Sequence, residues 1–132
     1  MVGNAVRLTL AYNQQAVTSL QVGANARWLL IGASVLMLAV VARLLWATQP
    51  ADRARAVGLA LLIGGATGNL LDRLASSRGV VDFIDVGLAG WRFWTFNVAD
   101  AGITVGAALL AWALWRGGTR VPVATRDGGV AT

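Results

Sequence analysis

The sequence predicts an all-α membrane protein with about three transmembrane helices and a small β-like segment near the N-terminus. Hydrophobic residues make up 57% of the 132 residues and charged residues only 13%, whereas soluble domains are about 45–50% apolar and about 25% charged. Three apolar runs are each long enough to cross a bilayer as a helix. A chain of this length normally forms one compact unit, so we treat residues 1–132 as a single integral membrane domain.

The segment 1–27 is expected to hold a short strand and a loop. Apolar and more polar residues alternate from Val6 to Tyr12, which is typical of a strand with one apolar face. Asn13 and the two glutamines after it end this pattern. They predict a turn or loop before the first helix.

Three apolar runs follow the strand segment. In chain order they cover residues 28–47, 56–74 and 96–115. The polar segments around them are the loop 48–55 and the tail 116–132. The first run would be about 30 Å long as a helix, which matches the hydrocarbon thickness. Trp28 and Trp46 mark its two ends, as in the aromatic belts of membrane proteins.

Small residues mark places where the second and third helices can pack closely. In the second run they recur every four positions, at Ala56, Ala60, Gly64 and Gly68, which puts them on one helix face. Gly102 and Gly106 offer a similar site in the third run. Such residues let helix backbones approach each other in a membrane.

Residue types that are absent exclude several kinds of site. The chain has no cysteine and no histidine, and its net charge of +5 comes from arginine alone, without lysine or glutamate. Disulfides, a thiol nucleophile, a lysine Schiff base and a serine with a histidine or lysine base are therefore excluded. A zinc site is disfavoured for lack of its usual ligands, and no metal or other cofactor is expected.

The arginines are scattered at the ends of apolar runs rather than clustered in a stripe. This pattern favours arginines that flank a membrane over a nucleic-acid partner. Because cysteine, histidine, lysine and glutamate are all absent, any hydrolytic chemistry must come from the six aspartates.

Three spans bring most of the carboxylates to one end of the bundle. Residues 1–27 and 72–95 fall on one side of the membrane, and the loop 48–55 and the tail on the other. The polar residues expected at the first end are Asp72, Asp82, Asp85, Asp100, Asn13, Asn69 and Asn97. A carboxylate in or beside a bilayer is costly without a partner, so such residues are candidates for function.

Spacing selects a possible dyad among them. Asn69 and Asp72 are three residues apart on one helix face, and Asn97 and Asp100 repeat that spacing. Asp82 lies in the predicted loop between these helices and can fold back over the same place. Two close carboxylates cannot both ionise easily, so one keeps its proton. The ionised carboxylate could then take a proton from water, while the neutral one donates its proton to the carbonyl oxygen of a peptide bond that is being hydrolysed.

Simpler structural roles compete with this interpretation. Asn97 can cap the last helix, with Asp100 favouring the dipole in its first turn. Asp72 and Arg73 can form an interfacial ion pair, and Asp85 is expected to be a solvated loop residue.

Three motifs resemble those of the lipoprotein signal peptidase family (signal peptidase II). The stretch from Gly64 to Arg73 is similar to the family's motif around Gly-Asn-Leu-x-Asp-Arg. The segments 80–84 and 96–104 are similar to its next two motifs, with order and spacing in agreement. The likeness extends over roughly residues 6–115. Family members usually have four spans and the first is missing here, so we expect either a misassigned start or a shortened homologue.

The resemblance implies an aspartic endopeptidase of the bacterial cytoplasmic (inner) membrane, with its site on the extracytoplasmic side. It places Asp82 and Asp100 at the catalytic positions. The positions that support the site or contact substrate are Asn13, Asn69, Asp72, Arg73 and Asn97. The implied partners are membrane lipid and diacylglyceryl-modified prolipoproteins, which are cut before the lipidated cysteine. The β-like segment would be extracytoplasmic, and no oligomeric state is indicated.

Three functions follow from this reading. The first is the active endopeptidase just described. The second is a non-catalytic, truncated homologue that binds lipidated precursors or a partner protein. The third is a small ion or proton carrier that uses the buried aspartates as a relay.

Overall fold

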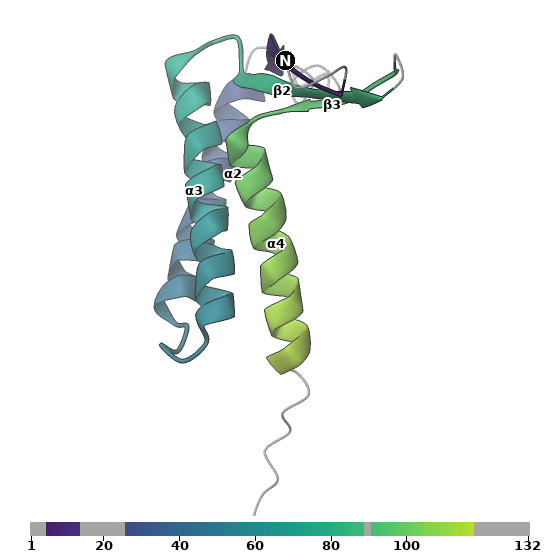
Figure 1. Cartoon of the computed structure of the whole chain (residues 1–132). Coiled ribbons are helices and arrows are strands. Elements are labelled where there is room, and N and C mark those ends of the chain that lie inside the picture. The colour runs from purple at the N-terminus through teal and green to yellow at the C-terminus, as the bar shows by residue number, and fades with distance from the viewer. Residues whose placement is uncertain (1–4, 14–25, 89–90, 118–132) are drawn as a thin grey trace, which may run out of the picture.

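The computed structural model describes residues 5–13, 26–88 and 91–117. Three long helices lie side by side and a three-stranded sheet lies across one end of them (Figure 1). The elements in chain order are β1 (Val6–Asn13), α2 (Ala26–Trp46), α3 (Arg53–Ala75), β2 (Val80–Leu88), β3 (Trp91–Phe96) and α4 (Val98–Gly117). The connection from α2 to α3 lies at the other end of the bundle (Figure 1).

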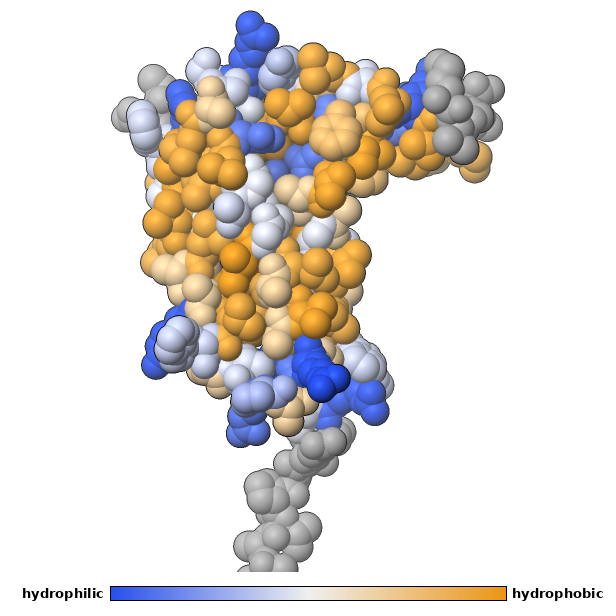
Figure 2. Space-filling view, turned by 60° about the vertical axis from the view of Figure 1, so that its left-hand side comes forward, coloured by the Kyte–Doolittle hydropathy of each residue, from blue (hydrophilic) through white to orange (hydrophobic). Residues whose placement is uncertain are grey.

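The helices α2, α3 and α4 are each long and apolar enough to cross a membrane, as the sequence predicts. Within the described residues only Leu59 and Val80 form a buried apolar core. Many large apolar side chains are instead exposed. On the face shown in Figure 2 they cover much of the middle of the bundle, and hydrophilic side chains gather at its two ends. This is the arrangement of a protein whose helices face lipid, because apolar burial inside the bundle is not what holds them.

The ends of α3 show why the helix begins and stops where it does. The Asp52 side chain accepts a hydrogen bond from the Arg55 amide at 3.2 Å, which caps the N-terminus. At the C-terminus the Ser76 amide donates to the Asp72 carbonyl at 2.9 Å. Gly79 then turns the chain into β2 with a φ of 93°, a conformation that side chains disfavour.

Glycines on α3 allow α4 to pack against it at close range. A Cβ at Gly58 would lie 3.0 Å from the Gly106 carbonyl oxygen, and one at Gly65 would overlap the Ala99 carbonyl. The predicted stripe is therefore wrong in part. Gly64 meets no heavy atom within 4 Å, because helical geometry turns it about 100° away from Gly65.

The sheet is larger than the sequence predicts. The predicted N-terminal strand is confirmed as β1, and it pairs antiparallel with β2, which pairs in turn with β3. The segment between the second and third helices, which the sequence predicts to be a loop, thus contributes two strands. The sequence does not indicate these two strands, because polar and apolar residues do not alternate regularly in this segment.

The register of the sheet brings the end of β1 close to the start of β2. Asp82 lies opposite Ala11, and Asn13 lies opposite Val80. A bulge between Leu8 and Ala11 shifts the pairing by one residue, which re-aims the side chains that follow it. The tail that was expected to be polar falls almost wholly in residues 118–132, outside the described residues.

Candidate active site

The buried polar residues of the described chain gather where α3 ends, β2 begins and α4 begins. Asp82 is 3% exposed, Asn97 is 4% exposed and Asn69 is 8% exposed. Each comes from a different part of the fold, namely β2, the start of α4 and the last turns of α3. A buried polar group is costly without hydrogen bonds, so their mutual contacts matter.

Asn97 and Asp100 form a reciprocal cap at the start of α4. The Asp100 amide donates to Asn97 Oδ1 at 2.9 Å, and the Asn97 amide donates to Asp100 Oδ2 at 3.3 Å. This is the geometry of a capping box, with aspartate in the position that usually holds glutamate or glutamine. The predicted capping role of Asn97 is therefore confirmed.

The Asn97 side chain also connects the two remaining parts of the site. Its Nδ2 donates to Asp82 Oδ1 at 3.0 Å and to Asn69 Oδ1 at 3.2 Å. Asn69 Nδ2 donates in turn to Asp100 Oδ1 at 2.8 Å. The carboxylates of Asp82 and Asp100 are thus tied together through two asparagine amides. Capping alone does not explain these contacts, because the cap uses the side-chain oxygen and the backbone amide of Asn97 but not its Nδ2.

The position of Asp82 follows from the strand that carries it. Val80 and Asp82 are both buried, as residues two apart on one face of a strand should be. Asp82 therefore lies in β2 and not in a loop, which corrects the sequence-based expectation. Its side chain points from the sheet toward the helices, where Asn97 meets it.

Asp72 and Arg73 have separate partners in the structure. Asp72 Oδ2 accepts a hydrogen bond from the Val81 amide at 3.2 Å, which fastens the start of β2 to α3. Arg73 donates from a terminal guanidinium nitrogen to the Asn69 carbonyl at 3.0 Å. Among the residues described, the salt bridge found joins Asp85 to Arg92. The expected Asp72–Arg73 ion pair is therefore wrong.

Two features of this end of the bundle escaped the sequence analysis. Arg27 at the start of α2 donates from Nε to the Arg73 carbonyl at 3.0 Å and from a terminal nitrogen to the Leu74 carbonyl at 3.2 Å. It thereby supplies partners for the last carbonyls of α3. No local pattern signals this contact, because 46 residues separate Arg27 from Arg73.

The second feature is a pair of charged residues in the sheet. The sequence predicts Asp85 to be a solvated loop residue, and this prediction is wrong. Asp85 belongs to β2 and forms a salt bridge with Arg92 on β3. The antiparallel register places Asp85 opposite Thr95 and Arg92 opposite Gly87. The guanidinium reaches the carboxylate diagonally, which ties the two strands together.

Comparison with known proteins decides the family. A family model described as Signal peptidase (SPase) II matches residues 1–116. The chain belongs to the signal peptidase II family. It is 42% identical over 90 residues to the lipoprotein signal peptidase of Methylobacterium sp. (strain 4-46), covering 67% of this chain and 53% of the relative. It is 39% identical over 107 residues to that of Coxiella burnetii (strain Dugway 5J108-111), covering 80% and 65%.

Two solved structures of bacterial membrane enzymes have a similar fold. One is described as a bacterial membrane enzyme determined by the in meso method at 1.9 Å resolution. It aligns with a TM-score of 0.72 and 27% identity over 86% of this chain and 72% of the other. A second bacterial membrane enzyme, at 24% identity with the same TM-score, shows the likeness of fold. The chain spans about half the length of the first relatives it matches, at 53% for two of them and 48% for a third.

The site residues predicted from the sequence all lie at or beside this end of the bundle. The structure brings Asn69, Asp82, Asn97 and Asp100 into one hydrogen-bonded cluster, and Asp72 and Arg73 adjoin it. The backbone of Asn13 pairs with Val80 at the edge of this cluster. In the part of the chain described here, no three metal-ligating side chains gather, and the expectation of no cofactor stays a prediction.

Proposed function

We propose that this chain is an aspartic endopeptidase that removes signal peptides from lipid-modified lipoprotein precursors, with Asp82 and Asp100 as its dyad. The observation that carries the proposal is the bridge through Asn97. One amide side chain donates to Asp82 and to Asn69, while Asn69 donates to Asp100. Two carboxylates tied together in this way, one of them buried, are the arrangement that acid–base hydrolysis of a peptide needs.

In the proposed reaction the two aspartates share one proton between them. The ionised carboxylate takes a proton from a water molecule, whose oxygen attacks the scissile carbonyl carbon. The protonated carboxylate donates its proton to the carbonyl oxygen, which gives a neutral tetrahedral diol. When the diol collapses, one of its hydroxyl groups gives a proton to the ionised carboxylate, the C–N bond breaks, and the departing amine receives the proton of the protonated carboxylate.

Asparagines suit the positions that bridge such a dyad. An amide NH2 donates two hydrogen bonds whether or not a carboxylate is ionised, and it does not change its own charge. Asn97 and Asn69 can therefore hold Asp82 and Asp100 in place while the shared proton moves. Preorganised donors of this kind lower the cost of reorganisation during the reaction.

The family supports a diacylglyceryl-modified prolipoprotein as substrate, cut before the lipidated cysteine. The proposed site lies at the end of the bundle that carries the sheet, on the extracytoplasmic side of the cytoplasmic membrane. Asp72, Arg73 and Asn13 are proposed to support the site or contact the substrate. Asp72 already holds the backbone amide next to Asp82, and Asn13 ends the strand that pairs with β2.

The test is a cleavage assay with purified 132-residue protein in phospholipid-free detergent and a diacylglyceryl-modified prolipoprotein. We expect Asp82→Asn and Asp100→Asn each to lower the cleavage rate by at least about a hundredfold. Asp52→Asn is the matched control, because it makes the same chemical change at the other end of the bundle and asparagine still caps α3. Circular dichroism checks that all three variants stay folded.

Wild-type rates in either dyad variant would overturn the assignment of Asp82 and Asp100. Absence of cleavage by folded wild-type protein, together with binding of the lipidated precursor, would favour the non-catalytic homologue instead. Proton flux in vesicles without a peptide substrate would favour the carrier.

A further inference from the structure

The three-stranded sheet extends past the helices to one side of the bundle (Figure 1). Leu88, at the end of β2, follows Asp82 by six residues, which is about 20 Å along a strand. A helix is only about 10–12 Å wide, so this part of the sheet projects beyond α4. We call it the overhang, and it consists of residues 6–8, 86–88 and 91–94.

The register of the strands assigns the side chains of the overhang to two faces. Asp82, Val86 and Leu88 share one face of β2, because side chains two residues apart point the same way. Asp82 contacts Asn97 at the start of α4, so this inner face is the one directed toward the helices. Cross-strand pairing places further apolar residues on the inner face, namely Val6, Leu8, Trp91 and Trp94.

The outer face of the overhang carries its charged residues. Arg7 lies opposite Asp85 in the sheet, and Asp85 forms a salt bridge with Arg92. A Cβ at Gly87 would lie 3.1 Å from Arg92 Cδ, which places the Arg92 side chain on the face away from Leu88. The overhang is therefore amphipathic, with its charges on one face and large apolar side chains on the other.

The apolar side chains of the inner face are not covered by the helices. Four of them are between 67% and 79% exposed, namely Leu8, Leu88, Trp91 and Trp94. Figure 2 shows apolar side chains along the overhang. A group of large exposed apolar side chains marks a surface that binds a partner or lipid. Tryptophan in particular favours the boundary between membrane and water.

The connection from β3 to α4 fixes the level at which the overhang lies. Only Asn97 separates the end of β3 at Phe96 from the start of α4 at Val98. Because α4 is a candidate membrane span, its first turn lies near the membrane surface. The sheet crosses the bundle at this end (Figure 1), so its inner face is directed toward the bilayer. The inner face is thus continuous with the lipid-facing surface of the helices.

We propose that the inner face of the overhang lies in the headgroup region of the bilayer, where Trp91 and Trp94 anchor the sheet to lipid. Leu8 and Leu88 then lie about 5–10 Å below the headgroup boundary, as the apolar faces of interfacial amphipathic helices do. The charged residues of the outer face stay in water. This contact holds β2, and with it Asp82, at a constant height relative to the membrane.

The test measures the depth of nitroxide labels, for which the chain is well suited because it has no cysteine. Leu8→Cys and Arg7→Cys form a matched pair, since the two residues are neighbours on opposite faces of β1. Each labelled variant is placed in phospholipid nanodiscs, and its collisions with oxygen and with a water-soluble nickel complex are measured by electron paramagnetic resonance. We expect labels at Leu8 and at Leu88→Cys about 5–10 Å below the phosphates, and the label at Arg7 in water.

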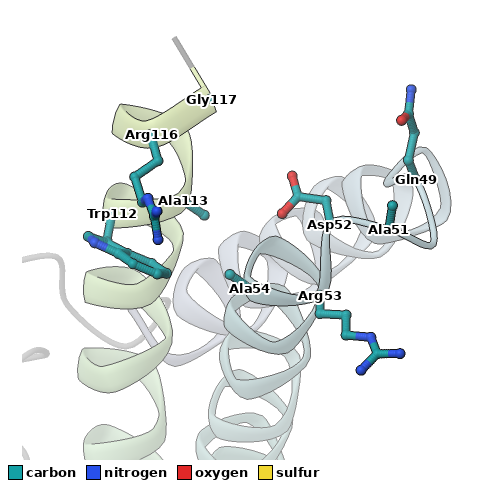
Figure 3. Close-up of a pocket in the computed structure, with 9 residues that line it drawn as sticks. All are labelled: Gln49, Ala51, Asp52, Arg53, Ala54, Trp112, Ala113, Arg116 and Gly117. Carbon is teal, nitrogen blue, oxygen red and sulfur yellow. The ribbon is translucent and has the colours of Figure 1, made fainter. Parts of the chain in front are cut away.

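Two further labels calibrate the scale of depth. Leu36→Cys gives the lipid reference, because Leu36 is 67% exposed in the middle of α2. Ala51→Cys gives the aqueous reference at the other end of the bundle. Ala51 lies in the connection before α3, in the wall of a hollow of about 610 Å³ (Figure 3).

A second set of variants tests the two anchors. Trp91→Ser combined with Trp94→Ser should move the label at Leu88 toward water, with a higher rate of collision with the nickel complex. Trp115→Ser is the control, because Trp115 is 76% exposed near the other end of α4, and it should leave the depth at Leu88 unchanged. Circular dichroism checks that the variants are folded.

Three results would overturn the proposal. One is a label at Leu8 or Leu88 that the nickel complex reaches as readily as it reaches the label at Arg7. Another is a label at Leu88 whose depth does not change when both tryptophans are replaced. The third is shielding of the inner-face labels from oxygen and nickel alike, which would show that protein rather than lipid covers this face.

Discussion

Asn97 donates a hydrogen bond of 3.0 Å from Nδ2 to Asp82 Oδ1, although 15 residues separate the two in the chain. The same asparagine caps α4 through its side-chain oxygen. One residue therefore both starts the helix that carries Asp100 and fixes the carboxylate on the neighbouring strand. These two roles use different atoms, so they can be separated by mutation.

We expect Asn97→Ser to separate them. Serine caps a helix about as well as asparagine. Its hydroxyl can accept the hydrogen bond of the Asp100 amide, but it has only one hydrogen and cannot donate to both Asp82 and Asn69 as the asparagine amide does. Thermal unfolding should therefore stay near wild type while the cleavage rate falls at least about tenfold. Asn97→Ala should lose both properties, with about 1 kcal/mol less stability. Equal activity in the serine variant and the wild type would show that the bridge to Asp82 is dispensable.

Gly65 and Gly64 provide a matched pair for the packing of α3 against α4. We expect Gly65→Ala to destabilise the protein by about 1–3 kcal/mol, because the new Cβ would overlap the Ala99 carbonyl and approach Ile103 Cγ1 at 2.7 Å. Gly64→Ala should be neutral or slightly stabilising, since nothing lies within 4 Å and alanine favours the helix. Thermal unfolding in one detergent compares the two. A similar loss in both variants would contradict the observed packing.

Asp72 should act through the backbone of β2. Its carboxylate accepts the hydrogen bond of the Val81 amide, so Asp72→Ala should speed hydrogen exchange at this amide and lower the cleavage rate. Asp72→Asn keeps an acceptor oxygen in place and should protect the amide nearly as well. Exchange measured by mass spectrometry on the peptide around Val81 distinguishes the two. Unchanged exchange in the alanine variant would show that the bond does not hold the strand.

Arg27 is expected to stabilise the end of α3 from a different helix. Arg27→Gln removes the charge and at least one of the two bonds to the carbonyls of Arg73 and Leu74. We expect a loss of about 1 kcal/mol, as for a typical hydrogen bond. Arg43→Gln, at the exposed other end of α2, is the control in the same thermal unfolding assay. If the two variants unfold at the same temperature, the Arg27 contact contributes nothing.

Local patterns in the sequence account for the spans and for the strand β1. A run of apolar residues or a two-residue alternation depends only on neighbours in the chain, so it can be read without the fold. The same holds for the cap at Asn97 and Asp100, whose partners are three residues apart. The boundaries moved by up to three residues, as at α3, which begins at Arg53, because capping contacts rather than hydropathy set them.

Contacts between distant residues could not be predicted in this way. The partner of Asp85 on β3, the carbonyls bound by Arg27 and the choice of Gly65 over Gly64 all depend on how the elements are oriented. The sequence alone predicts a loop between the second and third helices, because the strands that form there are stabilised by each other and by β1. Strand formation there is a property of the sheet rather than of the segment.

The sequence by itself determined that this chain is a membrane protein of the signal peptidase II family with three apolar helices, and it singled out the polar residues that gather at one end. It could do so because composition, hydrophobic run length and motif spacing are properties of the chain alone. The tertiary structure decided which of these residues touch, and in particular that Asn97 and Asn69 link Asp82 to Asp100. Hydrogen bonds require specific atoms to lie about 3 Å apart in defined directions, and only the packing of α3, β2 and α4 brings those atoms together.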